Sequence, residues 1–304
     1  MTKRILISIC VLAATLSLAQ EGAYCGDKGV WLQILGSGGA DLTDQRSSAS
    51  YLVWQDEHAR VLIDTGSGSA LRFDEAGADF ADLDAVVFTR LQAYNTVDFP
   101  SLIEGSLKSG RERVLPVFGP AIPEGESTTD FISRLIGPDG AYGYLSRFLT
   151  VDSPAEYRIN VRDVMAIGTR RWADFGTENV KLSAIPVHHG GLPALAWRVE
   201  IDGISLVFAG GFSNQKGTVA SLAQNAHALV VHHAISESAR GRIRDLYARP
   251  SDLGRIATAA NARSLVLGHR TTRTLGMETI HMANIEEHYS GPYYFADELQ
   301  CWGW

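Results

Sequence analysis

Five of the nine histidines of this chain stand where predicted β-strands end, and imidazoles gathered at such points can bind zinc or act as a base. Each follows a short run of apolar and β-branched residues, and together they are His188, His189, His232, His233 and His269. Strand ends along one edge are where α/β proteins gather side chains for chemistry. We therefore expect these imidazoles to lie close together. The alternative is that each is a hydrogen-bonded residue at the entrance to a loop.

A second polar segment follows the predicted strand 84–89 and precedes a helical segment at 97–110. Its polar side chains are poor metal ligands, and they are Arg90, Gln92, Tyr94 and Asn95. A guanidinium group repels a dication, and a phenol with a pKa of about 10 coordinates only as the phenolate. The position of this segment suits an active-site loop, but its residue types do not suit a metal.

These residues need strands and helices to position them, and the apolar pattern predicts two series of strands. Bounded by turn residues, these strands are expected at 31–36, 50–54, 59–66, 84–89 and 115–120, and then at 180–187, 195–201, 204–211, 228–234 and 264–270. Helices are expected at 97–110, 128–137, 217–226, 237–247, 250–262 and 277–291.

The order of strands and helices predicts two sheets whose outer faces are covered by helices. Asp202-Gly203 is a strong hairpin signal, so the sheets should be mixed and not purely parallel. Ser251 is expected to cap one helix, and Gly291 to end another. The segment 137–180 is the least regular and is expected to form loops over one edge.

The first residues have the pattern of a signal peptide: Lys3 and Arg4, an apolar run, and a small-residue cleavage site. We expect cleavage after Ala19, export to the periplasm or medium, and a single domain over 20–304. A lipoprotein with Cys10 modified and an uncleaved anchor are the alternatives. No other stretch is long and apolar enough to span a membrane.

Removal of residues 1–19 leaves 25 basic and 34 acidic residues, a net charge of −9, without a basic run. Nucleic acid is therefore not an expected partner. The two remaining cysteines, Cys25 and Cys301, lie near opposite ends of the chain. In an oxidising compartment they are expected to form a disulfide, with two unpaired thiols as the alternative.

Two further motifs give no evidence of a phosphate site or of a nucleophilic serine. Gly36, Gly38 and Gly39 are not followed by a helix start or a Gly-Lys-Ser, so they indicate a turn and not a phosphate loop. Ser67 and Ser69 lie in glycine-rich turns without the strand–serine–helix elbow of a serine hydrolase.

Taken in order, "QILGSGGA", "VLIDTGSG", "FTRLQAYN", "PVHHGGLPALAWRVE", "VFAGGFSNQ", "LVVHHA" and "LVLGHR" resemble the metallo-β-lactamase superfamily, in its ribonuclease Z-like and arylsulfatase-like branch. The resemblance runs from about Trp31 to Gly291. It implies a four-layer αββα sandwich of two mixed sheets. It also implies two metal ions at one edge of the sandwich, where a bridging hydroxide attacks the substrate.

Carried over position by position, the resemblance predicts that most metal ligands are replaced. The family motif Thr-His-x-His-x-Asp-His reads Thr89-Arg90-Leu91-Gln92-Ala93-Tyr94-Asn95 here. The carboxylate that bridges the metals corresponds to Gly211. The two retained positions are His189 and His269, and Asp64 corresponds to an aspartate that supports the site loops.

Three functions follow from this pattern. The first is a non-catalytic exported protein, in which Arg90 and the surviving histidines bind an anionic or polar small molecule, or in which the site serves as a partner surface. The second is a hydrolase of an ester, phosphodiester or similar substrate with one zinc ion, held by His189, His269 and one of His188, His232 or His233. The third is a metal-independent enzyme with His189 or His233 as base. The ligand count favours the first, with no cofactor.

Overall fold

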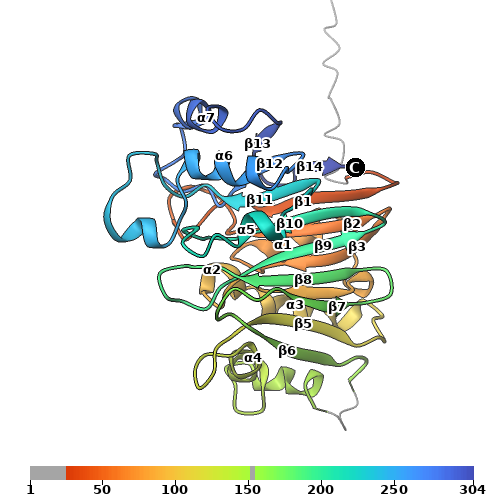
Figure 1. Ribbon diagram of the computed structural model, residues 1–304. Helices are drawn as coiled ribbons and strands as arrows, with labels where there is room; N and C mark the ends of the chain where they lie inside the picture. The colour runs from red at the N-terminus through yellow and green to blue at the C-terminus, as the bar shows by residue number, and fades with distance from the viewer. Residues whose placement is uncertain (1–24, 151–154) are drawn as a thin grey trace, which may run out of the picture.

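The computed structural model describes residues 25–150 and 155–304, so the predicted signal peptide lies outside the described residues. The chain forms two mixed seven-stranded sheets packed face to face, with helices outside them (Figure 1). This confirms the predicted αββα sandwich. Among the described residues, no helix is both long enough and apolar enough for a membrane span.

The first sheet has the order β14-β1-β2-β3-β4-β5-β6. The bounds of its strands are β1 Val30–Gly36, β2 Ser50–Gln55, β3 His58–Ile63, β4 Ala85–Val87, β5 Leu115–Ala121, β6 Ile159–Met165 and β14 Cys301–Gly303. Pairing is antiparallel from β14 to β3 and parallel from β3 to β6.

The second sheet repeats this arrangement in the order β13-β12-β11-β10-β9-β8-β7. The bounds of its strands are β7 Trp172–Gly176, β8 Lys181–Pro186, β9 Leu195–Ile201, β10 Ile204–Phe208, β11 Ala228–His232, β12 Leu265–Gly268 and β13 Tyr293–Phe295. Pairing is antiparallel from β7 to β10 and parallel from there to β13. Asp202 and Gly203 form the predicted hairpin turn, with φ of 50° and 80°.

Helices cover both outer faces. On the first sheet lie α1 Ser69–Glu75, η1 Phe80–Asp82, α3 Phe99–Gly105, η2 Ser106–Lys108, α4 Thr128–Ile136 and η3 Gly143–Phe148, with α2 Ala93–Thr96 at the edge. On the second lie α5 Val219–Leu222, η4 Gly241–Asp245, α6 Pro250–Ala259 and α7 Glu278–Glu286. One apolar core fills the space between the sheets, and two more lie beneath the helices.

Several local predictions are wrong. The segment 137–180 contains the edge strands β6 and β7, and 237–247 forms only the short 3₁₀ helix η4, where Gly241 has φ of 71°. Ser69 begins helix α1 instead of lying in a turn. Ser251 lies inside α6, where its hydroxyl donates to Glu237, and α7 ends before Gly291 is reached.

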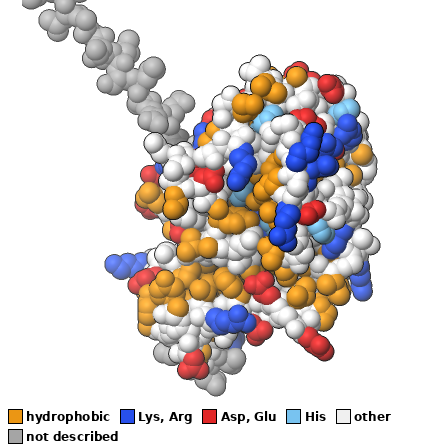
Figure 2. Space-filling view, turned by 90° about the vertical axis from the view of Figure 1, so that its left-hand side faces the viewer, with side chains coloured by type: hydrophobic (Ala, Val, Ile, Leu, Met, Phe, Trp, Pro, Cys, Tyr) orange, Lys and Arg blue, Asp and Glu red, His pale blue; other side chains and the backbone are white. Residues whose placement is uncertain are grey.

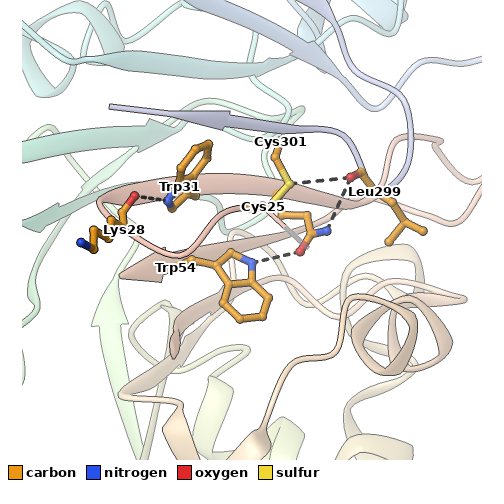
Figure 3. Close-up of a disulfide and its surroundings, with 7 residues drawn as sticks. Cys25, Lys28, Trp31, Trp54, Leu299 and Cys301 are labelled. Atoms are coloured by element: carbon orange, nitrogen blue, oxygen red, sulfur yellow. Dashed lines mark hydrogen bonds between the residues drawn. A yellow bond between two sulfur atoms is a disulfide. The ribbon is translucent and has the colours of Figure 1, made fainter. Parts of the chain in front are cut away.

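The disulfide joins Cys25 to Cys301, as the sequence predicts, across a separation of 276 residues (Figure 3). It connects the segment before β1 to β14, which pairs with β1. Figure 3 shows Trp31 on β1 and Trp54 on β2 in its surroundings. The two ends of the described chain are therefore fastened to one edge of the first sheet.

The two sheets are joined by hydrogen bonds next to the polar segment that follows β4. The indole N–H of the buried Trp197, on β9, donates to the carbonyl oxygen of Phe88 at 2.9 Å. The backbone N–H of Leu195 donates to the carbonyl of Thr89 at 3.0 Å. Because a buried carbonyl left without a donor is costly, these bonds fix the end of β4 against the second sheet.

Candidate functional site

Loops that follow five strands meet at one edge of the sandwich. Arg90 follows β4, His189 follows β8, Gly211 follows β10, His232 ends β11 and His269 follows β12. All five are buried. The prediction that histidines from three strand ends come together therefore holds for one residue from each: His189, His232 and His269.

Asp64 organises the loop that follows β4. It is fully buried, with φ of 56°, and its carboxylate accepts from the Thr89 N–H at 2.7 Å and the Thr89 hydroxyl at 2.6 Å. It also accepts from the Asn95 side-chain amide at 2.8 Å. Burial raises its pKa to about 6, although the bonds from Thr89 and the charge of Arg90 oppose this rise. The carboxylate of Asp64 therefore links the end of β3 to the loop that follows β4.

Arg90 occupies the centre of the site, and its side chain is only 1% exposed. Its Nη1 donates to the carbonyl of Gly211 at 3.1 Å, and its Nε lies 3.4 Å from the side-chain oxygen of Asn95. Its guanidinium nitrogens lie 3.4 Å from Nδ1 of both His189 and His232. A guanidinium carries donors only, so the Nδ1 of His232 must be the acceptor in that contact.

His189 is oriented by a different partner. Its Nδ1 lies 2.8 Å from the carbonyl oxygen of Leu246, so this nitrogen carries the hydrogen. Burial, followed by the charge of Arg90, lowers the pKa of His189 to about 3. The imidazole is therefore neutral at pH 7 and lies beside a permanent cation.

Gly211 lets Arg90 take this position. A Cβ at residue 211 would lie 2.2 Å from Arg90 Nη1, 2.8 Å from Tyr247 Cε1 and 3.1 Å from His189 Cε1. Real Cβ atoms do not approach other atoms within 3.0 Å. A side chain at 211, including a carboxylate, cannot coexist with this conformation of Arg90.

His232 and His269 stack with their ring centroids 4.0 Å apart and 3° between the ring planes. Tyr247, which no sequence motif indicates as a site residue, places its hydroxyl 3.4 Å from Nε2 of His269. Burial, followed by nearby positive groups, lowers the pKa of both histidines well below its ordinary value. Neutral rings can stack at this distance without charge repulsion.

Tyr94 and Gln92 lie at the outer side of the site. The Tyr94 hydroxyl donates to the side-chain oxygen of Gln92 at 2.5 Å, and the guanidinium of Arg90 lies 5.3 Å from the centre of the Tyr94 ring. The same ring is 5.3 Å from the His269 ring. Tyr94 therefore lies beside both the buried cation and the histidine stack.

The second histidine of each pair lies elsewhere. His188 is half-buried, and its Nδ1 lies 2.8 Å from the Ser213 hydroxyl. His233 packs against His281 and Phe295, with ring centroids 4.7 and 5.4 Å away. Successive residues of an extended chain face opposite sides, which explains why only one member of each pair reaches the site.

The side chains present do not fit a dinuclear zinc centre. Within residues 25–150 and 155–304, no three His, Cys, Asp or Glu side chains converge as a metal site. Arg90 places a fixed positive charge between His189 and His232, and position 211 offers a carbonyl that already accepts from Arg90. A hydrolytic zinc site needs about three protein ligands and an open position for water.

The two-sheet sandwich with a site at its edge defines a metallo-β-lactamase fold, and the sequence comparison agrees. Residues 59–270 match the model of the beta-lactamase superfamily domain. The chain therefore belongs to the beta-lactamase superfamily.

Two curated relatives are similar to part of this chain. Ribonuclease Z of Clostridium acetobutylicum is 25% identical over 169 residues, which are 56% of this chain and 49% of the relative. Ribonuclease Z of Clostridium novyi is 31% identical over 86 residues, or 28% and 27% of the two chains. This chain thus spans half the length of these relatives or less.

Two solved structures share the fold. The short form of human tRNase Z has a TM-score of 0.69 at 15% identity, covering 90% of this chain and 98% of that one. The metallo-beta-lactamase fold protein YhfI from Bacillus subtilis has a TM-score of 0.66 at 16% identity, covering 90% and 99%. At these identities the similarity shows the fold alone.

Proposed function

We propose that this protein is an exported, non-catalytic member of the metallo-β-lactamase fold that acts by binding a small molecule or a partner. The observation that carries the proposal is the buried guanidinium of Arg90, which lies 3.4 Å from His189 and His232 and donates to the Gly211 carbonyl. It stands where the family would hold cations, and unlike a zinc ion it offers no position for an activated water.

The neighbouring groups support this proposal. Asp64 accepts three hydrogen bonds from Thr89 and Asn95, which connect it to the loop after β4. His189 directs one nitrogen to the Leu246 carbonyl, and His269 contacts Tyr247. These contacts support structural roles for His189 and His269.

The signal-peptide pattern and the Cys25–Cys301 disulfide support export to the periplasm or medium. A disulfide persists in an oxidising compartment, whereas cytosolic thiols are kept reduced. Mass spectrometry of the protein recovered from each cell fraction tests this part of the proposal. We expect a mature chain that begins near residue 20, and a full-length chain confined to the cytosol would contradict it.

The absence of metal chemistry is tested by elemental analysis of protein purified without chelator from zinc-supplemented medium. We expect zinc well below one ion per chain, at a level unchanged in His189→Ala and His269→Ala. Turnover of phosphodiester, sulfate-ester and lactone substrates should stay at the level of the buffer. One zinc per chain that is lost in His189→Ala, with hydrolysis lost in parallel, would refute the proposal in favour of a mononuclear hydrolase.

A further inference from the structure

A cleft of about 260 Å³ lies beside the buried arginine site, and it differs from the other clefts in the charges that line it. It is formed where the end of β6, the loop after β8 and the loop before α5 meet, and its polar side chains are His188, His189 and Lys216. No Asp or Glu lines it, whereas each of three other clefts in the described part contains at least one carboxylate. In a chain with an excess of acidic residues, this cleft favours an anion.

Lys216 is the main source of that preference. It is half-buried, and no hydrogen bond or ion pair to it is found among the described residues. Burial lowers its pKa, which means that the ammonium is partly removed from water without a protein counter-charge. An anion placed beside it would offset this cost through a charge-assisted hydrogen bond.

His188 adds a second polar group. Its Nδ1 is hydrogen-bonded to the Ser213 hydroxyl at 2.8 Å, and its Nε2 has no hydrogen-bond partner in the described part of the chain. The Ser213 contact fixes the ring, so Nε2 is available to a ligand in the cleft that His188 lines. One ammonium and one imidazole suit an anionic group with a single charge.

The remaining walls are apolar and partly exposed. Ile167 is 49% exposed and Leu192 is 43% exposed, and both line the cleft with Ile122, Val187 and Pro193. Figure 2 looks onto the side of the molecule where the loops of the site lie, and it shows hydrophobic side chains exposed there as a band, with Lys and Arg side chains above it. Exposed apolar surface next to a few polar groups is the composition of a small-molecule site.

We propose that this cleft binds a small organic monoanion, a carboxylate or sulfonate with an apolar body, through Lys216 and His188. The proposal rests on the binding function proposed above and moves the ligand site from Arg90 to the adjacent cleft. His189 separates the two, since it lines the cleft and also contacts Arg90. A volume of about 260 Å³ corresponds to about nine water molecules at about 30 Å³ each, which suits a ligand on the order of ten non-hydrogen atoms.

Benzoate and its neutral isostere benzamide are suitable probes, with benzylamine as the cation of similar size. Isothermal titration of the full mature protein at pH 7 should show benzoate binding at millimolar concentration. Benzamide should bind at least about tenfold more weakly, because a hydrogen bond to a charged group is worth more than a neutral one. Benzylamine should not bind.

Lys216→Met should weaken benzoate binding about tenfold or more, and Lys216→Arg should retain most of it because the charge is kept. Lys181→Met is the matched control, since Lys181 is an exposed lysine that lines a different cleft. Thermal melts of the three variants verify that they are folded.

Equal affinity for benzoate and benzamide, or benzoate binding unchanged in Lys216→Met, would overturn the cleft as the site. No binding of any probe at millimolar concentration would overturn it as well. These outcomes leave the non-catalytic proposal standing. Zinc-dependent turnover, by contrast, would refute that proposal while the comparison of wild type with Lys216→Met still decides the cleft.

Discussion

Acid should destabilise this protein steeply, because four buried histidines are held neutral in the folded state. Burial is the first cause for all four, and their exposed fractions are only 1–2%. The pKa falls to about 3 for His189 and His233, and well below its ordinary value for His232 and His269. In the unfolded chain, each should have a pKa of about 6.5.

The direction in which stability changes with pH follows from proton linkage. A histidine with a depressed folded pKa binds fewer protons in the folded state than in the unfolded state. Its contribution to stability is fully present above about pH 6.5 and is lost as the pH falls toward the folded pKa. Asp64 acts in the opposite direction, since burial raises its pKa to about 6. Its contribution is present below about pH 4 and is lost as the pH rises through 6.

The loss in the free energy of unfolding between pH 7 and pH 5.5 depends on the pKa of histidine in the unfolded chain and hardly at all on the exact pKa values in the folded state. Each histidine loses about 1.2 kcal/mol over this interval, so four lose about 5 kcal/mol. Protonation of Asp64 returns about 0.8 kcal/mol. The net loss of about 4 kcal/mol is a large part of the 5–15 kcal/mol that holds a typical domain together.

Urea denaturation at several pH values between 7 and 5.5, extrapolated linearly to water, measures this loss. His233→Phe keeps a ring of similar size in the core and should reduce the loss between pH 7 and 5.5 by about 1.2 kcal/mol, or about 0.8 kcal/mol per pH unit on average. Thr129→Val is the control, because Thr129 is exposed on α4 and its side chain does not titrate. A free energy of unfolding that stays flat or rises between pH 7 and 5.5 would refute the reasoning.

Three further predictions concern the site and the ends of the chain. Gly211→Ala should destabilise the fold by about 1–3 kcal/mol through overpacking against Arg90, and Arg90→Met in the same chain should recover part of that loss. Strict additivity of the two changes in denaturation experiments would contradict direct contact. Thr89→Val removes the 2.6 Å bond to Asp64 and should cost about 1–3 kcal/mol, whereas Thr129→Val, on the exposed face of α4, should cost less than about 0.5 kcal/mol. Cys25→Ser with Cys301→Ser should lower the free energy of unfolding by up to about 4–5 kcal/mol, and an unchanged thermal midpoint would show that the disulfide closes no costly loop.

The fold could be predicted where local signals and tertiary packing agree. The long β-branched runs become strands close to the predicted bounds, and Asp202-Gly203 adopts the positive φ values that its turn requires. The short strands β13 and β14 were missed, since three residues form a strand only when a neighbour is present to pair with them. The predicted helix at 237–247 failed because Gly241 adopts a left-handed conformation and Glu237 turns back to hold Ser251.

The sequence predicted which residue types lie at the site, but not which side chains point into it. Each pair of adjacent histidines contributes one ring to the site, and which ring does so depends on the exact strand end, to within one residue. Tyr247 carried no signal, because its predicted helix does not form and its contacts with His232 and His269 are purely tertiary. The burial of Arg90 could not be predicted from the sequence either, since it depends on how far this side chain reaches into the fold.

Positions 90 and 211 act as one unit. Arg90 needs the carbonyl of residue 211 as an acceptor, and it needs the space that a side chain there would fill. A carboxylate at 211 alone would collide with the guanidinium, and a histidine at 90 alone would leave that carbonyl without its donor. Neither single change restores a metal ligand set. Asn95 connects this pair to the rest of the loop, because its amide donates to Asp64 at 2.8 Å while its oxygen lies 3.4 Å from Arg90 Nε.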